Sequence, residues 1–410
     1  MTLKPDLEEQ GVTSRKIDRL VRRALEKSNR KIVTVKIQQF SAEKVGYLGL
    51  HLHVRVITLD KDSSRKDTQE FFVKTIPYHN VAQVYVIEER NAFSKEVIFF
   101  DKLVPLMMEG YDGEPWCATC YATEEDTLVL DDLRTRGFTN RSGLFDEELV
   151  KSALSCMARF HASSLLTEHR LQKKLMDMYP RAFEEGSFLR TGKIYQWFKA
   201  GVDLAVTIAK KLGLDPAEIP RACEEVFRTV EPSPTKKNVI CHADIWSSNL
   251  VFDKSSPPKC RIVDFQLIRY SPPVQDVICF MYLTTNRDFR KAQEVPMLRH
   301  YYSTLVETMK ANNASVEVPT WSEIVTAMEE QRLGAVVSAV IFYPTVLMDR
   351  KIATKIFGDP ESYANFVYND RRSTVLEIMK SDMEYAKRIE EAVKELHEFS
   401  TKIDHLAVPT

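Results

Sequence analysis

Three polar residues have types and spacing that suit phosphoryl transfer. Asp244 and Asn249 lie in HADIWSSN (242–249), and Asp264 lies in VDFQ (263–266). Transfer to an alcohol needs a carboxylate that accepts the hydroxyl hydrogen bond, and oxygen ligands for the magnesium ion that neutralises the phosphates. Asp244 and Asn249 alone each have an ordinary explanation, because Asp and Asn are common in turns. Asp264 does not fit it as well, because an Asp that ends an apolar run and precedes Phe265 is an unusual core residue. The three together in this order predict a site for ATP and Mg²⁺.

Short apolar segments before each of these residues indicate how they meet. NVIC (238–241) reads as a strand, so Asp244 falls in the loop that leaves it. The β-like pieces 249–252 and 260–264 are expected to pair as an antiparallel hairpin, in which Asn249 and Asp264 emerge side by side.

Lys74 lies in the strand-like segment EFFVKTIP (70–77), both faces of which are mostly apolar. A buried ammonium group costs several kcal/mol unless it is paired. Glu96 falls within the apolar stripe of the neighbouring predicted helix and is the expected partner, with Glu89 as the second choice. The alternative is that Lys74 lies at a strand end and extends into water.

The elements that must position these residues divide the chain into two parts. The strand segments expected in the first part are 31–40, 45–59, 70–77, 116–122 and 127–131. Helices are expected from Thr13 or Ser14 and near 88–106, then from Asp146 to about Leu166, and over 286–312, 320–349 and 372–398. We therefore predict an α+β, bilobal fold, with a small β-rich lobe at 1–132 and a larger helical lobe at 133–410. Ligand sites favour such lobe interfaces.

Composition excludes some classes of function. The 410 residues include 57 Lys and Arg against 58 Asp and Glu, a net charge of -1 that does not favour nucleic acid or an anionic membrane. There is no apolar signal-peptide core and no apolar run long enough to cross a bilayer. The seven cysteines are dispersed, which is typical of free thiols in the cytoplasm. Cys117 and Cys120 are expected to be packed thiols, because a metal site would need a second ligand pair.

Several motifs together carry a resemblance to a known family. They are EFFVKTIP, FSKEVIFF (93–100), LVLDDLRTRGF (128–138), MARFHASS (157–164), HADIWSSNLVF (242–252) and RIVDFQLIRYSPPVQDV (261–277). In this order they resemble the ecdysteroid-kinase-like family, a branch of the protein-kinase-like superfamily that includes choline and aminoglycoside kinases. The motifs extend from about residue 46 to 277.

The resemblance implies a role for each of the residues considered above. Asp244 would be the catalytic-loop aspartate, and Asn249 and Asp264 would be the magnesium ligands. Lys74 would hold the α- and β-phosphates of ATP, with Glu96 orienting it.

Further roles follow from the same resemblance. The backbone from Asp131 to Leu133 would form the hinge that contacts adenine, and Gly46 and Gly49 in VGYLGLH would form a sparse phosphate-binding loop. Asp276 would brace the catalytic loop, although a helix N-cap is an equal alternative.

Three other positions qualify the resemblance. His161 is expected to be a packing residue, because it falls on the apolar face of its helix. Gln266 stands where protein kinases have the glycine of Asp-Phe-Gly, which argues against a mobile activation switch. Ala243 stands where the family usually has glycine, a change we expect to be minor.

The function implied is that of an ATP-dependent kinase for a small-molecule hydroxyl, on a steroid-like (ecdysteroid) or xenobiotic acceptor. The alternatives are a choline- or aminoglycoside-type kinase and a non-catalytic nucleotide-binding protein; no nucleic-acid, membrane or protein partner is expected. Aromatic residues of the helical part could line a flat acceptor pocket or form ordinary core. They are Trp197, Phe280, Tyr282, Tyr301, Tyr302, Trp321, Phe342, Tyr343 and Phe366.

Overall fold

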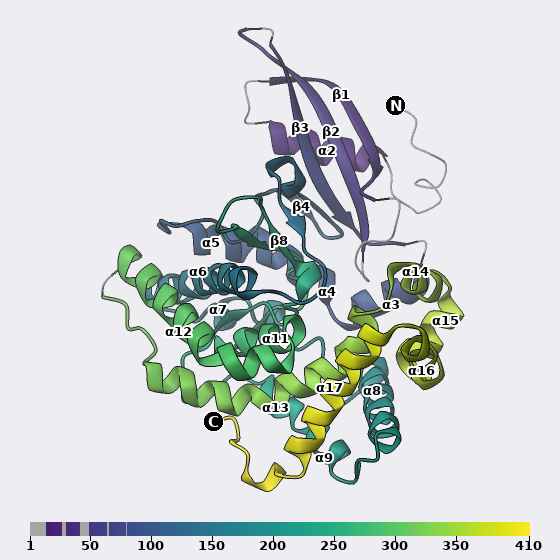
Figure 1. Cartoon of the computed structure of the whole chain (residues 1–410). Helices are drawn as coiled ribbons and strands as arrows, with labels where there is room; N and C mark the ends of the chain where they lie inside the picture. The colour runs from purple at the N-terminus through teal and green to yellow at the C-terminus, as the bar shows by residue number, and fades with distance from the viewer. Residues whose placement is uncertain (1–13, 27–29, 42–48, 64, 79, 314) are drawn as a thin grey trace.

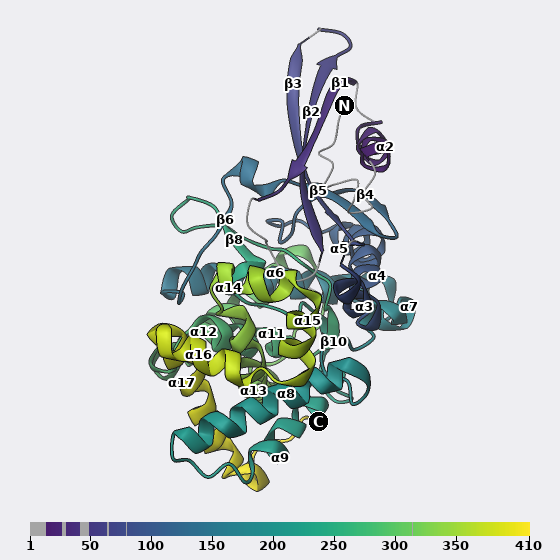
Figure 2. The same ribbon diagram turned by 90° about the vertical axis from the view of Figure 1, so that its right-hand side faces the viewer.

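A five-stranded antiparallel sheet forms the first part of the chain (Figures 1 and 2). The computed structural model describes residues 14–26, 30–41, 49–63, 65–78, 80–313 and 315–410. The strands are β1 (Arg30–Gln39), β2 (Leu50–Asp60), β3 (Lys66–Thr75), β4 (Cys120–Glu124) and β5 (Thr127–Asp131), in the order β1-β2-β3-β5-β4. All five strand segments expected from the sequence are present. The fourth, however, begins only at Cys120, so the expected start at residue 116 is wrong.

Helix α2 (Ser14–Leu25) covers one face of this sheet. Its apolar stripe, which includes Ile17, Leu20 and Val21, is buried against the strand residues Val54 and Phe71. The helix was expected from the sequence, but Thr13, one of its two predicted caps, lies outside the described residues. Burial of this stripe gives the sheet a hydrophobic core of its own.

The segment between β3 and β4 is more broken than expected. Instead of one helix near 88–106, it forms α3 (Val81–Glu89), α4 (Ala92–Ile98), a π-helical turn η1 (Phe99–Leu103) and α5 (Val104–Met108). The break falls at Asn91, which has a left-handed backbone with φ 53°. Asparagine tolerates this conformation better than most residues, so the chain can change direction there and start α4.

The larger part of the chain is helical. Its helices are α6 (Glu147–Leu171), α7 (Leu175–Met178), α8 (Gly192–Lys211), α9 (Ile219–Glu224), α10 (Val226–Thr229), α11 (Val274–Thr284), α12 (Arg287–Asn312), α13 (Trp321–Val346), α14 (Arg350–Gly358), α15 (Pro360–Ala364), α16 (Arg372–Ser381) and α17 (Met383–Ser400). The single helical stretch expected over 372–398 is two helices, because Asp382 caps α17 by accepting the Tyr385 amide. Asp146 caps α6 as expected, by accepting the Leu149 amide.

Two small sheets lie within the helical part. Strands β7 (Val239–Cys241) and β10 (Arg269–Ser271) pair with each other. Strands β6 (Thr139–Asn140), β8 (Leu250–Phe252) and β9 (Cys260–Ile262) form the second sheet, in the order β6-β8-β9. The loops that leave β7 and β9 carry the residues singled out from the sequence.

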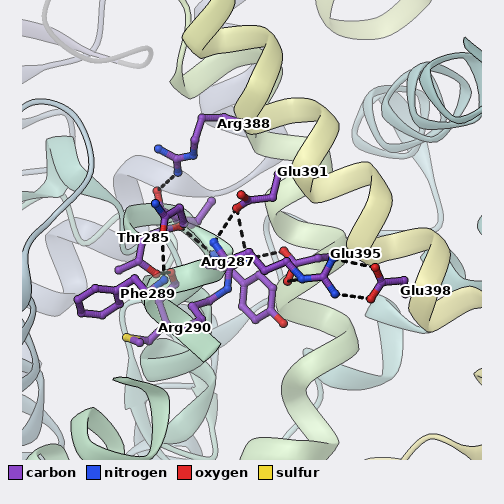
Figure 3. Close-up of polar contacts among 12 residues, drawn as sticks. Thr285, Arg287, Phe289, Arg290, Arg388, Glu391, Glu395 and Glu398 are labelled. Atoms are coloured by element: carbon purple, nitrogen blue, oxygen red, sulfur yellow. Dashed lines mark hydrogen bonds and ion pairs between the residues drawn. The ribbon is translucent and has the colours of Figure 1, made fainter. Parts of the chain in front are cut away.

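The C-terminal helix α17 is attached to the corner between α11 and α12 by a network of arginine and glutamate residues (Figure 3). Arg290 is 5% exposed and bonds to Glu395 on α17, and its other terminal nitrogen donates to the Thr285 carbonyl at 2.8 Å. Arg287 pairs with Glu398 nearer the surface, at 2.7 Å. Arg388 donates to the Tyr343 hydroxyl at 2.8 Å. The network therefore fixes the end of the chain to the helical core.

The α+β, bilobal architecture predicted from the sequence is confirmed by this arrangement. The division at residue 132 stays a prediction; it falls between β5 and the 3-10 turn η2 (Leu133–Arg136). All seven cysteines are free. Among the described residues, no single helix is long and apolar enough to cross a membrane, although α13 and α14, bent by 85°, meet that criterion as a pair.

Candidate active site

Lys74 on β3 is buried and bridges two carboxylates. It is 3% exposed, and its Nζ lies 2.6 Å from Glu96 Oε2 and 2.6 Å from Asp264 Oδ1. Burial alone would lower the pKa of the Lys74 ammonium, but the charges of Asp264 and Glu96 outweigh it and raise the pKa. Lys74 therefore carries a positive charge in the interior, and the alternative of a solvated strand end is wrong.

Glu96 on α4 joins the Lys74 strand to the Asp264 turn. Its second oxygen, Oε1, accepts the backbone N–H of Phe265 at 3.0 Å. The ring of Phe265 stacks on Phe99, with centroids 4.2 Å apart, so the turn is held by packing as well as by hydrogen bonding. Glu89, the second choice as partner for Lys74, instead accepts the Lys193 amide at 2.7 Å.

The hairpin of β8 and β9 brings Asn249 and Asp264 together as expected. Leu250 pairs with Ile262, and the amide of Val263 donates to the Asn249 carbonyl at 3.0 Å. Asp264 has a left-handed backbone, with φ 70°. The Asn249 side-chain nitrogen donates to Asp244 Oδ2 at 3.0 Å, so its side-chain oxygen is the atom that can serve as a ligand.

Asp244 lies in the loop after β7 and is partly buried beside these groups. Burial raises the pKa of its carboxyl to about 6, with a further rise from Asp264 and opposing effects from His242 and Arg90. A carboxyl with this pKa is ionised at neutral pH, so it can accept a hydrogen bond from a hydroxyl group.

Asp276 on α11 accepts hydrogen bonds from the backbone of the Asp244 loop. One Asp276 oxygen accepts the His242 amide at 2.6 Å, and the other accepts the Ala243 amide at 2.9 Å. His161 also bonds to Asp276, at 3.1 Å, and to the Tyr301 hydroxyl. Asp276 thus braces the loop, as the resemblance implies, and is not the N-cap of α11, which is Pro273. His161 is buried behind it as a packing residue.

Ala243 and His242 complete this loop. Ala243 has φ 62°, a conformation that costs a residue with a Cβ about 1–2 kcal/mol relative to a right-handed one. The expectation that alanine here is a minor change is therefore wrong in energetic terms. His242 accepts the Asp244 amide at Nδ1, so its Nε2 carries the proton and donates to the Val263 carbonyl at 3.0 Å. This bond ties the Asp244 loop to the Asp264 strand.

The four residues face one cleft of about 480 Å³ between the sheet and the helices. Lys74, Asp244, Asn249 and Asp264 all line it. Gly49 lies against Lys74 with φ 111°, and a Cβ there would come within 3.3 Å of Lys74 Cε. Gly46, the other glycine of the expected phosphate loop, lies outside the described residues.

The expected hinge residues also line the cleft, but three of their backbone atoms are already engaged. The Asp131 amide donates to the Thr119 carbonyl at 2.8 Å, the Asp132 carbonyl accepts the Thr135 amide at 3.0 Å, and the Leu133 carbonyl accepts the Phe138 amide at 3.1 Å. An adenine contact at the hinge would therefore need other backbone atoms of this segment. The Asp131 carboxylate pairs with Arg136 at 2.9 Å.

The far side of the cleft, beyond Asp244, is apolar and aromatic. Trp197 and Phe342, for which the sequence left pocket lining and ordinary core open, line it. The other aromatic residues proposed for this pocket are elsewhere: Phe280, Tyr282, Tyr301, Tyr343 and Phe366 are buried core, and Tyr302 packs on Trp321. The rest of the wall comes from Trp246, Phe357 and Tyr363, which the sequence did not reveal. Of these three, only Trp246 could have been found from the sequence, because it lies between the predicted site residues Asp244 and Asn249.

A family model matches residues 45–314 of the chain, about two thirds of its length, and its description is the ecdysteroid kinase-like family. The chain belongs to this family. The matched range includes Lys74, Glu96, Asp244, Asn249 and Asp264, and ends after α12. The part of the aromatic wall that comes from α13, α14 and α15 therefore lies outside the matched range, whereas Trp197 and Trp246 lie within it.

An uncharacterized kinase-like protein of Caenorhabditis elegans is 26% identical over 171 residues, which are 39% of this chain and 42% of that protein. Among solved structures, an ethanolamine kinase of Plasmodium vivax matches with 10% identity and a TM-score of 0.40, covering 84% of this chain and 81% of that one. A choline kinase of Cryptosporidium parvum matches with 11% identity and a TM-score of 0.40, covering 88% and 93%. These TM-scores are too low to assign a role to any site residue, so the roles rest on the chemistry and geometry of the site alone.

Proposed function

We propose that the protein is an ATP-dependent kinase that phosphorylates a hydroxyl group of a small molecule. The observation that carries this proposal is the convergence of Lys74, Asp244, Asn249 and Asp264, which are far apart in the sequence, on one cleft. Phosphoryl transfer depends mostly on positioning and on charge stabilisation, and these residues offer both.

Each residue has a role that its surroundings support. Asp244 accepts the hydrogen bond of the acceptor hydroxyl and directs its oxygen. Asn249 and Asp264 offer the neutral and anionic oxygen ligands that Mg²⁺ prefers, and bound Mg²⁺ would neutralise charge on the phosphates. Lys74, held in the cleft by Glu96, would hold the α- and β-phosphates.

The acceptor that suits the cleft is apolar and uncharged or anionic, such as a steroid-like or xenobiotic alcohol. A cationic acceptor of the choline or aminoglycoside type would be favoured by free carboxylates, whereas those in the cleft other than Asp244 are paired with cations. Glu96 and Asp264 bond to Lys74, and Asp131 and Asp132 bond to Arg136 and Arg134. The aromatic wall favours a flat molecule. We therefore rank the choline- or aminoglycoside-type alternative second.

The test is a measurement of Mg²⁺-dependent ATP consumption with a panel of hydroxysteroids, plant phenolics, choline and aminoglycosides. We expect product with an apolar alcohol, identified by mass spectrometry, and no product with Asp244→Ala or Asp264→Ala. Lys74→Ala should weaken ATP use strongly. Full turnover by either aspartate variant would remove that residue from its role, and absence of turnover in the wild type with every acceptor would favour the non-catalytic alternative.

The proposal also includes a cellular location and a binding partner. We propose a cytoplasmic protein, supported by its seven free cysteines. Its partner would be the small-molecule acceptor, and the balanced surface charge gives no support to a nucleic-acid partner.

A further inference from the structure

Arg90 lies at the C-terminal end of α3 and lines the cleft on the side of the aromatic wall. Its guanidinium carbon is 5.2 Å from the centroid of the Trp197 ring, which lines the same cleft. The side chain is partly buried, and its Nε has no hydrogen-bond partner in the part of the chain that the structure describes. No carboxylate of the described residues lies within ion-pair distance of this guanidinium.

A second arginine of the cleft shows how such a charge is normally satisfied. Arg134 donates to both oxygens of Asp132, at 2.9 and 2.6 Å, and lies over the ring of Phe40. Arg90 has the aromatic neighbour but lacks the carboxylate. A buried guanidinium nitrogen without an acceptor is costly, because it has lost water and gained no equivalent hydrogen bond, and Arg90 Nε is such an atom.

Arg90 is also close to the reacting end of the cleft. Burial is the main influence on the pKa of Asp244, which it raises, and Arg90 is among the charges that oppose this rise. Tyr363, on the aromatic wall, likewise feels the charge of Arg90. Arg90, Asp244 and Tyr363 line the same cleft, so the guanidinium shares it with the carboxylate that would receive the hydroxyl and with the wall that would receive the apolar body of the acceptor.

We propose that Arg90 binds an oxygen atom of the acceptor, a carbonyl or a carboxylate, and so selects alcohols that carry such a group. This inference rests on the proposed kinase function for the identity of the bound molecule. The planar donors of arginine suit an oxygen acceptor, and the Trp197 ring restricts the plane in which the guanidinium can lie. The acceptor class is then a mainly apolar alcohol with an oxo or carboxyl group.

The test uses three benzyl alcohols of similar size: 4-(hydroxymethyl)benzoate, its methyl ester and 4-methylbenzyl alcohol. Their affinities are measured by calorimetry without ATP, for the wild type, Arg90→Met and Arg90→Lys. In the wild type we expect both oxygen-bearing probes to bind roughly 10- to 100-fold more tightly than 4-methylbenzyl alcohol, the range for hydrogen bonds to a charged group. Arg90→Met should remove most of this preference, and Arg90→Lys should restore part of it for the carboxylate.

The controls separate this proposal from misfolding and from the kinase function. Arg372→Met alters an exposed arginine paired with Asp370, away from the cleft, and should keep the wild-type preference. ATP affinity of Arg90→Met checks that the fold is intact. An unchanged preference in Arg90→Met, or no preference in the wild type, would overturn the proposal. Preferential binding without any phosphate transfer would instead contradict the kinase function and leave the Arg90 site standing.

Discussion

Asp244 belongs to the loop that Asp276 braces, and the two carboxylates have opposite effects on the stability of the fold. Burial raises the pKa of Asp244 to about 6, so its ionised form is disfavoured in the folded protein. Burial would also raise the pKa of Asp276, but hydrogen bonds from His161 and the backbone amide of His242 outweigh it and lower the pKa. The ionised form of Asp276 therefore stabilises the folded protein, whereas that of Asp244 destabilises it. A destabilising group of this kind is expected where function requires it.

We therefore predict that Asp244→Asn abolishes phosphate transfer and yet stabilises the protein at pH 7. The folded pKa is above the unfolded value, so ionisation weakens the wild type as pH rises from about 4 through 6. A shift of about two pKa units corresponds to roughly 2–3 kcal/mol. The gain in Tm of the variant over the wild type should grow across this pH range and then level off, as measured by calorimetry.

Asp276→Asn is the matched control with the opposite sign. It replaces one oxygen with an amide nitrogen, which would face one or two of the three donors around Asp276, so we expect it to lower the free energy of unfolding by about 1–3 kcal/mol at pH 7. A stability difference for Asp244→Asn that does not change with pH would mean that burial does not disfavour the Asp244 charge.

Ala243 gives a second prediction at the scale of a residue. Because its φ is 62°, Ala243→Gly should raise the free energy of unfolding by roughly 0.5–1 kcal/mol, and Ala243→Val should lower it by more than about 1 kcal/mol. Chemical denaturation measures both. If glycine is less stable than alanine here, the left-handed backbone of this loop is not the conformation in solution.

Residues were predictable from the sequence where a polar group interrupts an apolar pattern. Lys74 and Glu96 were found in this way, and they do pair. Arg90 was not found, because it follows two glutamates in EERN, a polar helix end in which one more charge carries no signal. Ala243 was noticed as a departure, but only its φ angle revealed the energetic cost.

At the scale of elements, the attachment of α17 depends on the buried pair of Arg290 and Glu395, which are 5% and 6% exposed. We predict that Arg290→Met destabilises the protein by about 3–5 kcal/mol, because it leaves the buried Glu395 with only the more distant Arg287 Nε, at 3.6 Å. The measurement is the free energy of unfolding in denaturant. Replacing both residues with methionine should recover most of the loss.

Arg287→Met is the control for this prediction. Arg287 belongs to the same network (Figure 3), but it pairs mainly with Glu398 near the surface and lies farther from Glu395, at 3.6 Å, so its loss should cost about 1 kcal/mol. Equal losses for the two variants would show that burial of the Arg290 pair contributes nothing beyond a surface ion pair.

The helices and strands that could be predicted from the sequence are those in which apolar residues recur at a regular period. Helices α2, α6, α12 and α13 and all five strands of the first sheet fall close to their expected ranges. The breaks at Asn91 and Asp382 were missed, because each depends on backbone conformation or capping at a single residue. Helices α14 and α15 were also missed; they are short, and their position depends on contacts with distant elements such as α3.

At the scale of the whole molecule, the cleft is formed by both lobes, so its ligand should stabilise them together. We predict that a non-hydrolysable ATP analogue with Mg²⁺, at 100 times its Kd, raises the free energy of unfolding by about 2.7 kcal/mol. Chelation of Mg²⁺ should remove most of the gain in Tm seen by scanning calorimetry, because the phosphates would then lose their counter-charge in the cleft.

Two aspartate variants sharpen this prediction. Asp264→Asn should lose the Mg²⁺-dependent part of the stabilisation, whereas Asp288→Asn, at an exposed position on α12, should keep it. If Asp264→Asn keeps the Mg²⁺-dependent gain in stability, the Mg²⁺ ligand is another residue.

The end of the family match after α12 has a consequence for how substrate range can change. The residues that would handle phosphate precede this point, whereas Phe342, Phe357 and Tyr363 follow it. Substitutions in the last quarter of the chain can therefore reshape the acceptor side without altering the phosphate side. A hybrid that keeps residues 1–314 and takes the remaining helices from another member of the family should retain this chain's handling of nucleotide and the Arg90 preference for an oxygen-bearing alcohol. It should differ from this chain in the shape of the apolar body that it accepts.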